Sequence, residues 1–248
     1  MDKDLELVIK DRILQSGILE IAVDNIQALS HEEYALKRKN YFGASDSSIL
    51  CGVNLYKTLD ALLKEKNLKY LTEEEKAVGE KPIVKKGYDL EPIILNKAAE
   101  QLDNPLVKPK DMFKFKKVNG LSVNYDGITV EDSCLIPVEA KLVSKYGEKY
   151  YNKHIKKSDA NIVSMNIEGD SLQAHIKRKA LKFGIPAYYY TQVQQEIAGL
   201  DAPYGYLAAL FDDSWDFKLY LIKRDDFVIN KIYNICESNI TKIKRDIH

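Results

Sequence analysis

Hydrophobic positions recur at helical spacing over several long segments of the chain. Apolar residues at positions 5, 9, 13, 14, 18, 21 and 26 predict helical structure over residues 4–28, with a possible break near Gly17. A short polar helix is expected over 31–38, opening at Ser30, and a glycine-bounded helical turn ends at Gly52, with Asp46 as its candidate N-cap. Further helices are predicted over residues 56–66, 83–101, 187–200 and 225–246, and residues 71–80 form an acidic, exposed run.

Apolar runs bounded by polar turns predict the strands, which cover residues 111–118, 121–130, 134–143, 204–211 and 216–223. Residues 144–175 are polar and predict irregular structure. Because the strands are bracketed by helices, the pattern indicates an α/β fold with a central mixed β-sheet flanked by helices. We interpret residues 1–248 as a single domain, with a helical N-terminal region over about 1–35 and a basic insertion over about 144–182.

Composition narrows the class of protein only slightly. Hydrophobic residues make up 45% and charged residues 30% of the chain, as in an ordinary soluble domain. No apolar run reaches the roughly 20 residues that span a bilayer, and the acidic N-terminus lacks the apolar segment of a signal peptide. We therefore expect a cytoplasmic protein that does not associate with a membrane. The three cysteines and the four histidines show no spacing typical of a disulfide framework or a zinc site.

Charge is unevenly distributed although the formal net charge is zero. Residues 1–34 hold eight acidic and three basic side chains, whereas residues 107–182 hold fifteen basic and nine acidic ones. The excess of positive charge in the middle of the chain permits a nucleic-acid groove, and it is equally compatible with a solvated lysine-rich surface.

The two predicted strands around residues 124–141 carry the strongest chemical signal. Glu139 and Lys141 are two residues apart and therefore project from the same face of one strand, and pairing with the preceding strand would bring Asp126 close to Glu139. Two carboxylates and one ammonium group at a sheet edge can hold a hard divalent cation and orient water for phosphodiester hydrolysis. The same residues can also form an ordinary surface salt bridge.

Five sequence blocks together resemble the YqaJ-like phage recombination nucleases, in the lambda-exonuclease branch of the PD-(D/E)XK superfamily. Each block alone is weak, but their order over residues 36–222 is fairly specific. The blocks are Phe42-Gly-Ala-Ser-Asp-Ser-Ser-Ile-Leu-Cys-Gly52, Gly87-Tyr-Asp-Leu-Glu-Pro92, Asp126-Gly127, Val138-Glu-Ala-Lys141 and Tyr190-Thr-Gln-Val-Gln-Gln-Glu196.

The resemblance implies a PD-(D/E)XK restriction-endonuclease-like core and a role for each matching residue. Asp126, Glu139 and the main-chain carbonyl of Ala140 match the ligands of Mg²⁺, for which Mn²⁺ is a plausible substitute. Lys141 matches the motif lysine, which would activate water or stabilise the charge of the transition state.

Two further residues match positions outside the two strands. Glu91, on the preceding helix, would bind a second metal ion or metal-bound water, unless it is a surface glutamate. Gln192 would hydrogen-bond the catalytic lysine or the scissile phosphate. Gln195 and Glu196 lie one turn further on and are compatible with simple helix surface.

Arg38 and Ser45 match a pocket for the 5′-terminal phosphate of DNA, since arginine grips phosphate bidentately and a serine hydroxyl can donate to it. The third position of the pocket is Asn124, where the family has serine. The alternative is that Ser45 caps a helix and Arg38 forms a surface ion pair.

The segment between Lys141 and Gln192 is longer than expected for the lambda-type enzymes and mixes lysines with tyrosines. We predict that Lys177, Arg178 and Lys179 contact the DNA backbone, the alternative being an insertion packed on the surface.

The resemblance predicts a Mg²⁺-dependent 5′→3′ double-strand exonuclease that generates 3′ single strands for phage-type recombination. It further implies a homotrimer, double-stranded DNA as substrate and a single-strand annealing protein as partner. Two rival hypotheses stay open: a restriction-type or structure-specific endonuclease on the same core, and a non-catalytic DNA-binding protein that kept the fold.

Overall fold

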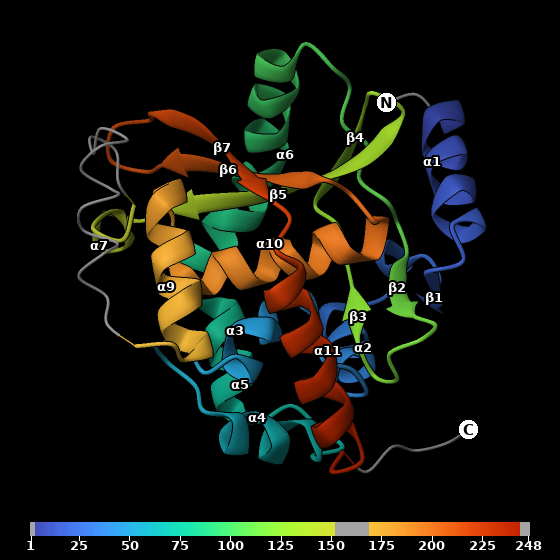
Figure 1. The fold of residues 1–248 in the computed structure, drawn as a ribbon, viewed down its shortest axis with the longest axis vertical. Helices are drawn as coiled ribbons and strands as arrows, with labels where there is room; N and C mark the ends of the chain where they lie inside the picture. The colour runs from blue at the N-terminus through green and yellow to red at the C-terminus, as the bar shows by residue number, and fades with distance from the viewer. Residues whose placement is uncertain (1–2, 152–168, 244–248) are drawn as a thin grey trace.

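A computed structural model describes residues 3–151 and 169–243 of the chain (Figure 1). Its helices are α1 (Lys3–Gln15), η1 (Ile26–Ala28), α2 (His31–Arg38), η2 (Ala44–Asp46), α3 (Ser47–Leu50), α4 (Leu59–Lys66), α5 (Glu73–Glu80), α6 (Pro82–Leu102), α7 (Lys145–Glu148), α9 (Leu172–Phe183), α10 (Ala187–Leu200) and α11 (Asp226–Ile240). Its strands are β1 (Leu19–Val23), β2 (Met112–Phe115), β3 (Ser122–Val123), β4 (Gly127–Glu131), β5 (Cys134–Val143), β6 (Tyr204–Phe211) and β7 (Phe217–Lys223).

The central sheet has four strands in the order β4-β5-β6-β7. Strand β5 pairs antiparallel with β4 and parallel with β6, so the sheet is mixed, as the sequence predicted. The turn between β4 and β5 consists of Asp132 and Ser133, with φ angles of 46° and 63°. Two positive φ values match the tight I′ type of hairpin turn, which fixes the register between the two strands.

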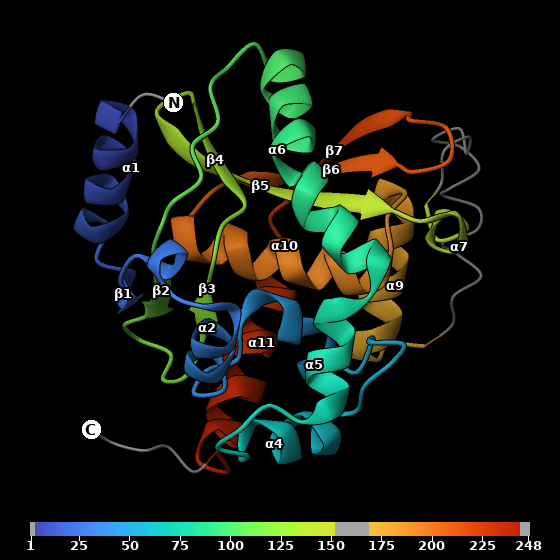
Figure 2. The same ribbon diagram turned by 180° about the vertical axis from the view of Figure 1, so that it is seen from behind.

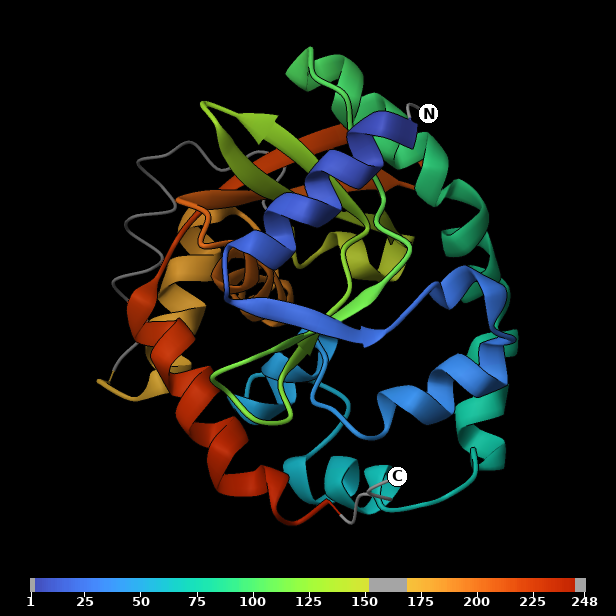
Figure 3. The same cartoon turned by 90° about the vertical axis from the view of Figure 1, so that its right-hand side faces the viewer.

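Helices cover both faces of this sheet. Helix α6 lies on one face, where a Cβ added at Gly127 would stand 3.0 Å from Leu95 Cδ2. Helix α10 lies on the other face, where a Cβ added at Gly205 would stand 3.1 Å from Ile197 Cγ1. Figures 2 and 3 show the two helices on opposite sides of the strands, and the flanked mixed sheet confirms the predicted fold class.

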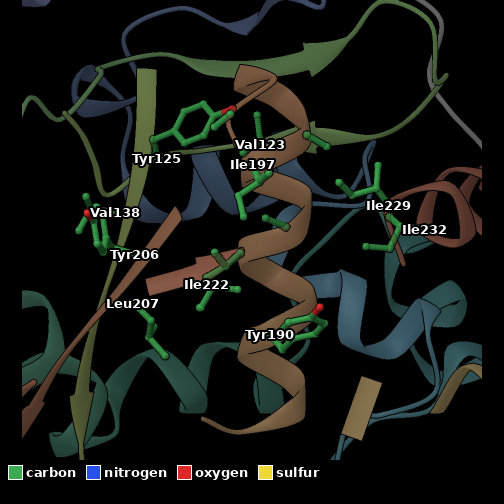
Figure 4. Packing of buried hydrophobic residues seen from close by; sticks show 14 of the residues in the cluster. Val123, Tyr125, Val138, Tyr190, Ile197, Tyr206, Leu207, Ile222, Ile229 and Ile232 are labelled. Carbon is green, nitrogen blue, oxygen red and sulfur yellow. The ribbon is translucent and has the colours of Figure 1, made fainter. Parts of the chain in front are cut away.

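Helix α10 forms the centre of the hydrophobic core. All ten residues from 190 to 199 are buried, and side chains from β3, β6, β7 and α11 surround the helix (Figure 4). A helix buried on every side has no solvent face. Its polar residues must therefore find partners inside the protein.

The helical prediction for residues 4–28 was wrong in its second half. Helix α1 ends at Gln15, and residues 19–23 form β1, which pairs antiparallel with β2 in a second sheet of order β1-β2-β3. The predicted strand 121–130 is also divided, since β3 ends at Val123 and β4 begins at Gly127. The interruption leaves Asn124 and Asp126 outside regular strand.

The prediction of irregular structure for residues 144–175 was wrong where the chain is described. Helix α7 occupies its start, and α9 begins at Leu172 after an N-cap by Ser171, whose side chain accepts from the Ala174 N–H. Residues 152–168, which include His154, lie outside the described residues. No helix in the described part of the chain is long and apolar enough to cross a membrane.

Candidate active site at the centre of the mixed sheet

The register between β4 and β5 places Asp126 beside Glu139. Gly127 pairs with Val138, and continuing the antiparallel register by one residue sets Asp126 opposite Glu139. Asp126 Oδ2 accepts a hydrogen bond of 3.0 Å from the Ala140 N–H, which anchors the carboxylate to β5. The pairing predicted from the sequence is therefore present.

Glu139 and Lys141 project from the same face of β5, toward α10. The Lys141 ammonium group forms an ion pair with Glu139 Oε1, and the Gln192 amide donates to the same carboxylate oxygen. The Glu139 side chain is only 3% exposed, whereas that of Lys141 is 24% exposed. The carboxylate is thus held inside the protein, and the lysine stays within reach of a substrate.

The charged groups of this cluster shift one another's pKa values. Burial, followed by the negative charge of Asp126, raises the pKa of Glu139 to about 7, although Lys141 acts in the opposite direction. Burial alone would lower the pKa of Lys141, but the charges of Glu139 and Asp126 outweigh it and raise that pKa. The lysine is therefore cationic at neutral pH, and the carboxylates repel each other.

Glu196 belongs to the same cluster, although the sequence left it as a candidate surface residue. It is 1% exposed, and its Oε1 lies 3.1 Å from Gln192 Nε2, one helical turn away. Burial and the charge of Glu139 raise its pKa well above the ordinary value. The polar run over residues 191–196 gave no sign of this burial, which comes from the packing of the helix inside the protein.

Glu91 approaches the cluster from α6. It forms an ion pair with Lys108, and its pKa is raised by burial and then by the charge of Asp126. Its side chain is 16% exposed, so it is not the surface glutamate of the alternative hypothesis. Glu91 interacts with Asp126 through its charge. It therefore lies beside the cluster of Asp126, Glu139 and Lys141.

Arg38 and Ser45 contact each other directly, through a hydrogen bond of 2.9 Å from Arg38 Nη2 to the serine hydroxyl. Within the described residues, Arg38 forms no ion pair and the buried Asn124 Oδ1 has no hydrogen-bond partner. The pKa of Tyr34 is raised by burial and also responds to the charges of Arg38 and Asp126, so this guanidinium group lies near the site.

Gln195 was also compatible with helix surface in the sequence, and it is fully buried. Its amide donates to the carbonyl groups of Ser122, at 2.7 Å, and Phe42, at 3.3 Å. These bonds tie α10 to β3 and to the loop that leads into Ser45. Gln195 therefore links the helix that carries Gln192 to the segment that leads into Ser45.

Lys177, Arg178 and Lys179 lie on α9, away from the carboxylates. Lys177 is exposed and the other two are half-buried, because successive helix positions point in different directions. Arg178 donates to the Gly169 carbonyl at 2.8 Å. The structure thus separates this basic run from Asp126 and Glu139.

The donor set suits a hard cation with few protein ligands. Among residues 3–151 and 169–243, no group of three His, Cys, Asp or Glu side chains is arranged as a metal centre. Mg²⁺, however, commonly takes one or two carboxylates and keeps several waters. Asp126 and Glu139 could supply two such ligands, and the raised pKa of Glu139 reflects nearby negative charge that a cation would neutralise.

Solved structures of other proteins share this fold. An alkaline exonuclease from Laribacter hongkongensis, LHK-Exo, aligns with a TM-score of 0.54 and 14% identity over 83% of this chain and 89% of that protein. Its complex with dAMP aligns with a TM-score of 0.56 and 15% identity over 85% and 91% of the two chains. At this level of identity the similarity establishes the fold.

The family follows from the sequence itself. Residues 33–199 match the model of the YqaJ-like viral recombinase domain, which spans more than half of the chain, and the protein belongs to that family. The matched range includes every residue of the central cluster and the Arg38–Ser45 pair. No curated protein sequence matches the chain.

Proposed function

We propose that this protein is a Mg²⁺-dependent deoxyribonuclease that degrades duplex DNA from its 5′ ends and leaves 3′ single strands for phage-type recombination. The observation that carries the proposal is the convergence of Asp126, Glu139 and Lys141 where β4 meets β5. Membership of the recombinase family supports a DNA substrate. The alkaline exonuclease that shares the fold supports exonuclease chemistry.

Each residue of the cluster has a separate role in the proposed reaction. Asp126, Glu139 and the Ala140 carbonyl would hold the cation, which would supply Lewis-acid activation of the scissile phosphate and of water. Lys141, cationic and partly exposed, contacts the phosphate and stabilises the charge that develops on it. Gln192 orients the Glu139 carboxylate through its amide.

Glu91 has a supporting role at the edge of the cluster. Its carboxylate is buried near Asp126 and is balanced by Lys108. We propose that Glu91 holds water of the metal's coordination shell or a second metal ion, with Lys108 released from it when the cation is bound.

We base the proposed direction of digestion on the Arg38–Ser45 pair. The Arg38 guanidinium group and the Ser45 hydroxyl provide hydrogen-bond donors near the cluster, whereas the unpartnered Asn124 Oδ1 is an acceptor. We propose that Arg38 and Ser45 bind the 5′-terminal phosphate, with Asn124 contributing through its amide group.

Family resemblance supports three partners beyond the metal. We propose double-stranded DNA as the substrate, a single-strand annealing protein as the recipient of the 3′ strand, and a homotrimer as the functional assembly. Sedimentation of the purified protein would test the last of these, since a monomer at assay concentrations would contradict it.

The metal site is tested by removing one carboxylate at a time. Asp126→Asn and Glu139→Gln should each abolish cleavage of linear duplex in Mg²⁺ and leave DNA binding largely intact, because the phosphate-binding cations remain. Lys141→Ala should lower the rate by about 10²- to 10³-fold. Nuclease rates and binding isotherms are the two measurements.

The matched control is Asp103→Asn, which makes the same change at an exposed helix end where φ is 50° and asparagine is tolerated. It should keep full activity. Full activity in Asp126→Asn would overturn the assignment of the metal site.

The end-recognition pocket is tested by the chemistry of the DNA end. Linear duplex with a 5′-phosphate should be digested faster than the same duplex with a 5′-hydroxyl group, and Arg38→Ala should erase that difference because a charge-assisted contact is lost. Closed circular DNA should resist digestion. Cleavage of closed circles would favour an endonuclease, and absence of cleavage on any DNA would favour the non-catalytic hypothesis.

A further inference from the structure

A cavity lined by tyrosines lies directly beyond Lys141. It encloses about 310 Å³ between the end of β5, α7 and the first turn of α10, a volume within the range of small-molecule sites. Figures 1 and 2 show α7 just past the end of β5. Its aromatic lining consists of Tyr56, Tyr146, Tyr150, Tyr151, Tyr188 and Tyr189.

The cavity presents aromatic surface to solvent. Tyr56 and Tyr146 are 82% and 85% exposed, which is unusual for large aromatic side chains and gives each a free ring face. Deeper in the lining, the rings of Tyr150 and Tyr188 meet edge to face, with centroids 6.5 Å apart. The buried Tyr151 hydroxyl has no hydrogen-bond partner among the described residues.

Positive charge stands at both ends of the aromatic lining. The Lys149 ammonium group lies 5.0 Å from the centroid of the Tyr150 ring. The Lys141 ammonium group, on the side of the active site, lies 5.4 Å from the centroid of the Tyr189 ring. Aromatic rings flanked by cations are the combination that binds single-stranded nucleic acid, because bases stack on the rings while phosphates meet the charges.

We propose that this tyrosine cavity binds a nucleobase of the 5′-ended DNA strand, the base of the nucleotide next to the scissile phosphate. The proposal rests on the nuclease function proposed above, in which Lys141 contacts that phosphate. Because Tyr189 belongs to the cavity and also packs against Lys141, a base in the cavity belongs to a nucleotide that adjoins the phosphate at Lys141. Stacking accepts every base, which suits an enzyme that digests any sequence.

A base can enter the cavity only from an unpaired nucleotide, since bases within a duplex are stacked on their neighbours. The cavity would therefore bind the frayed end of the duplex. The free energy gained by stacking in the cavity would offset the free energy needed to unpair that end. The base would lie among the tyrosine rings of the lining. The exposed rings of Tyr56 and Tyr146 would cover its faces.

The test measures binding of DNA in EDTA, where no cleavage occurs. The probe is a duplex with a short unpaired 5′ end, labelled for fluorescence anisotropy, in the intact form and with an abasic sugar at each of the first three positions. Tyr146→Ala and Tyr56→Ala should each raise Kd by about 5- to 100-fold, the effect of losing one stacked base. Tyr146→Phe should stay within about twofold of the wild type, because the ring is kept.

Abasic DNA shows whether the tyrosines act through a base. At one of the three positions the abasic sugar should weaken binding by the wild type by a similar factor, and it should have no further effect in Tyr146→Ala. Tyr70→Ala is the matched control, since Tyr70 is also exposed, at 61%, and is not part of the cavity lining. Its Kd should equal that of the wild type.

Three results would overturn the inference: equal Kd values for intact DNA and all three abasic forms, equal effects of Tyr146→Phe and Tyr146→Ala, or an effect only when the abasic sugar is in the 3′-ended strand. Cleavage of the intact duplex in Mg²⁺ is measured separately. If the abasic sugar does not change Kd but cleavage is normal, only the assignment of the cavity is wrong. If the abasic sugar changes Kd but no DNA is cleaved, the nuclease proposal is wrong.

Discussion

At the scale of single residues, the site concentrates carboxylates in a place where their charges are costly. Glu139 and Glu196 are both buried; the charge of Glu139 raises the pKa of Glu196, whereas a hydrogen bond with Glu196 lowers the pKa of Glu139. Two adjacent buried carboxylates repel each other, and Lys141 is paired with only one of them, Glu139. Because burial and the charge of Glu139 raise the pKa of Glu196 well above its ordinary value, we expect Glu196 to be the carboxyl group that keeps its proton.

A protonated Glu196 leads to a prediction about its replacement by glutamine. A carboxylic acid and an amide have the same shape, and each can donate and accept, so Glu196→Gln should change the free energy of unfolding by less than about 1 kcal/mol. Glu196→Ala removes one of the two partners of the Gln192 amide and leaves a cavity, and should cost about 2–4 kcal/mol. Urea unfolding in EDTA at pH 7 measures both.

Glu100→Gln makes the same change on the exposed surface of α6 and serves as the control, with no measurable effect expected. A stabilisation of more than about 2 kcal/mol by Glu196→Gln would show instead that Glu196 is ionised, because the substitution would then remove a buried charge next to Glu139.

At the scale of elements, α10 is the part that joins the sheet, the loop before Ser45 and the second sheet. Its close approach to Tyr125 depends on Gly199. A Cβ at this position would overlap the Tyr125 hydroxyl and would stand 3.3 Å from Leu19 Cδ1 and 3.4 Å from Val123 Cγ1. The glycine thus sets how near the helix lies to the segment that carries Asp126.

Gly199→Ala should therefore destabilise the protein although alanine favours helices by about 1 kcal/mol. Overpacking costs about 1–3 kcal/mol, and Tyr125 is buried and cannot swing away. In a Tyr125→Phe background the hydroxyl is gone, and the cost of Gly199→Ala should fall by at least about 1 kcal/mol. A double-mutant cycle of unfolding free energies measures the difference, and additive effects would contradict the steric explanation.

The sequence predicted those elements whose pattern is determined locally. Helix α10 and strands β5 and β6 fall at their predicted limits because their turns and periodicity are intrinsic to each segment. Strand β1 was missed because its partner, β2, lies some ninety residues away and overrides helical spacing. Burial of Glu196 was missed for a similar reason, since it depends on the packing of α10 between two layers and not on the helix itself.

The contacts in the candidate site likewise differ in whether the sequence could predict them. Spacing on one strand placed Glu139 beside Lys141, and hairpin register placed Asp126 beside both, so these contacts were predictable from the sequence. The hydrogen bond between Arg38 and Ser45 was not, because it joins a helix to a loop whose position depends on contacts with β3 and Gln195.

At the scale of the whole molecule, zero net charge conceals an excess of positive charge over residues 107–182. The basic run of α9 lies outside the carboxylate cluster, and α9 packs against α10, the helix that carries Gln192. Its charge comes mostly from lysines, which act as flexible point charges, whereas base readout favours rigid bidentate side chains. We expect this helix to contact the DNA backbone.

Replacing Lys177, Arg178 and Lys179 with alanine should therefore weaken binding to all DNA sequences alike. Each lost phosphate contact should reduce the log–log dependence of affinity on salt concentration by about one unit. Titrations with two unrelated duplexes at several salt concentrations measure both effects.

A control variant with alanine at Lys64, Lys97 and Lys231 removes the same charge from α4, α6 and α11, and separates local contacts from the general effect of net charge. If α9 contacts phosphates, only the α9 variant should change the salt dependence strongly. Its processivity should fall more than its single-turnover cleavage, because the catalytic carboxylates are untouched and the enzyme mainly loses its hold on the duplex between cuts. A loss confined to one sequence would favour the restriction-type endonuclease, and an unchanged salt dependence would mean that the basic run is solvated surface.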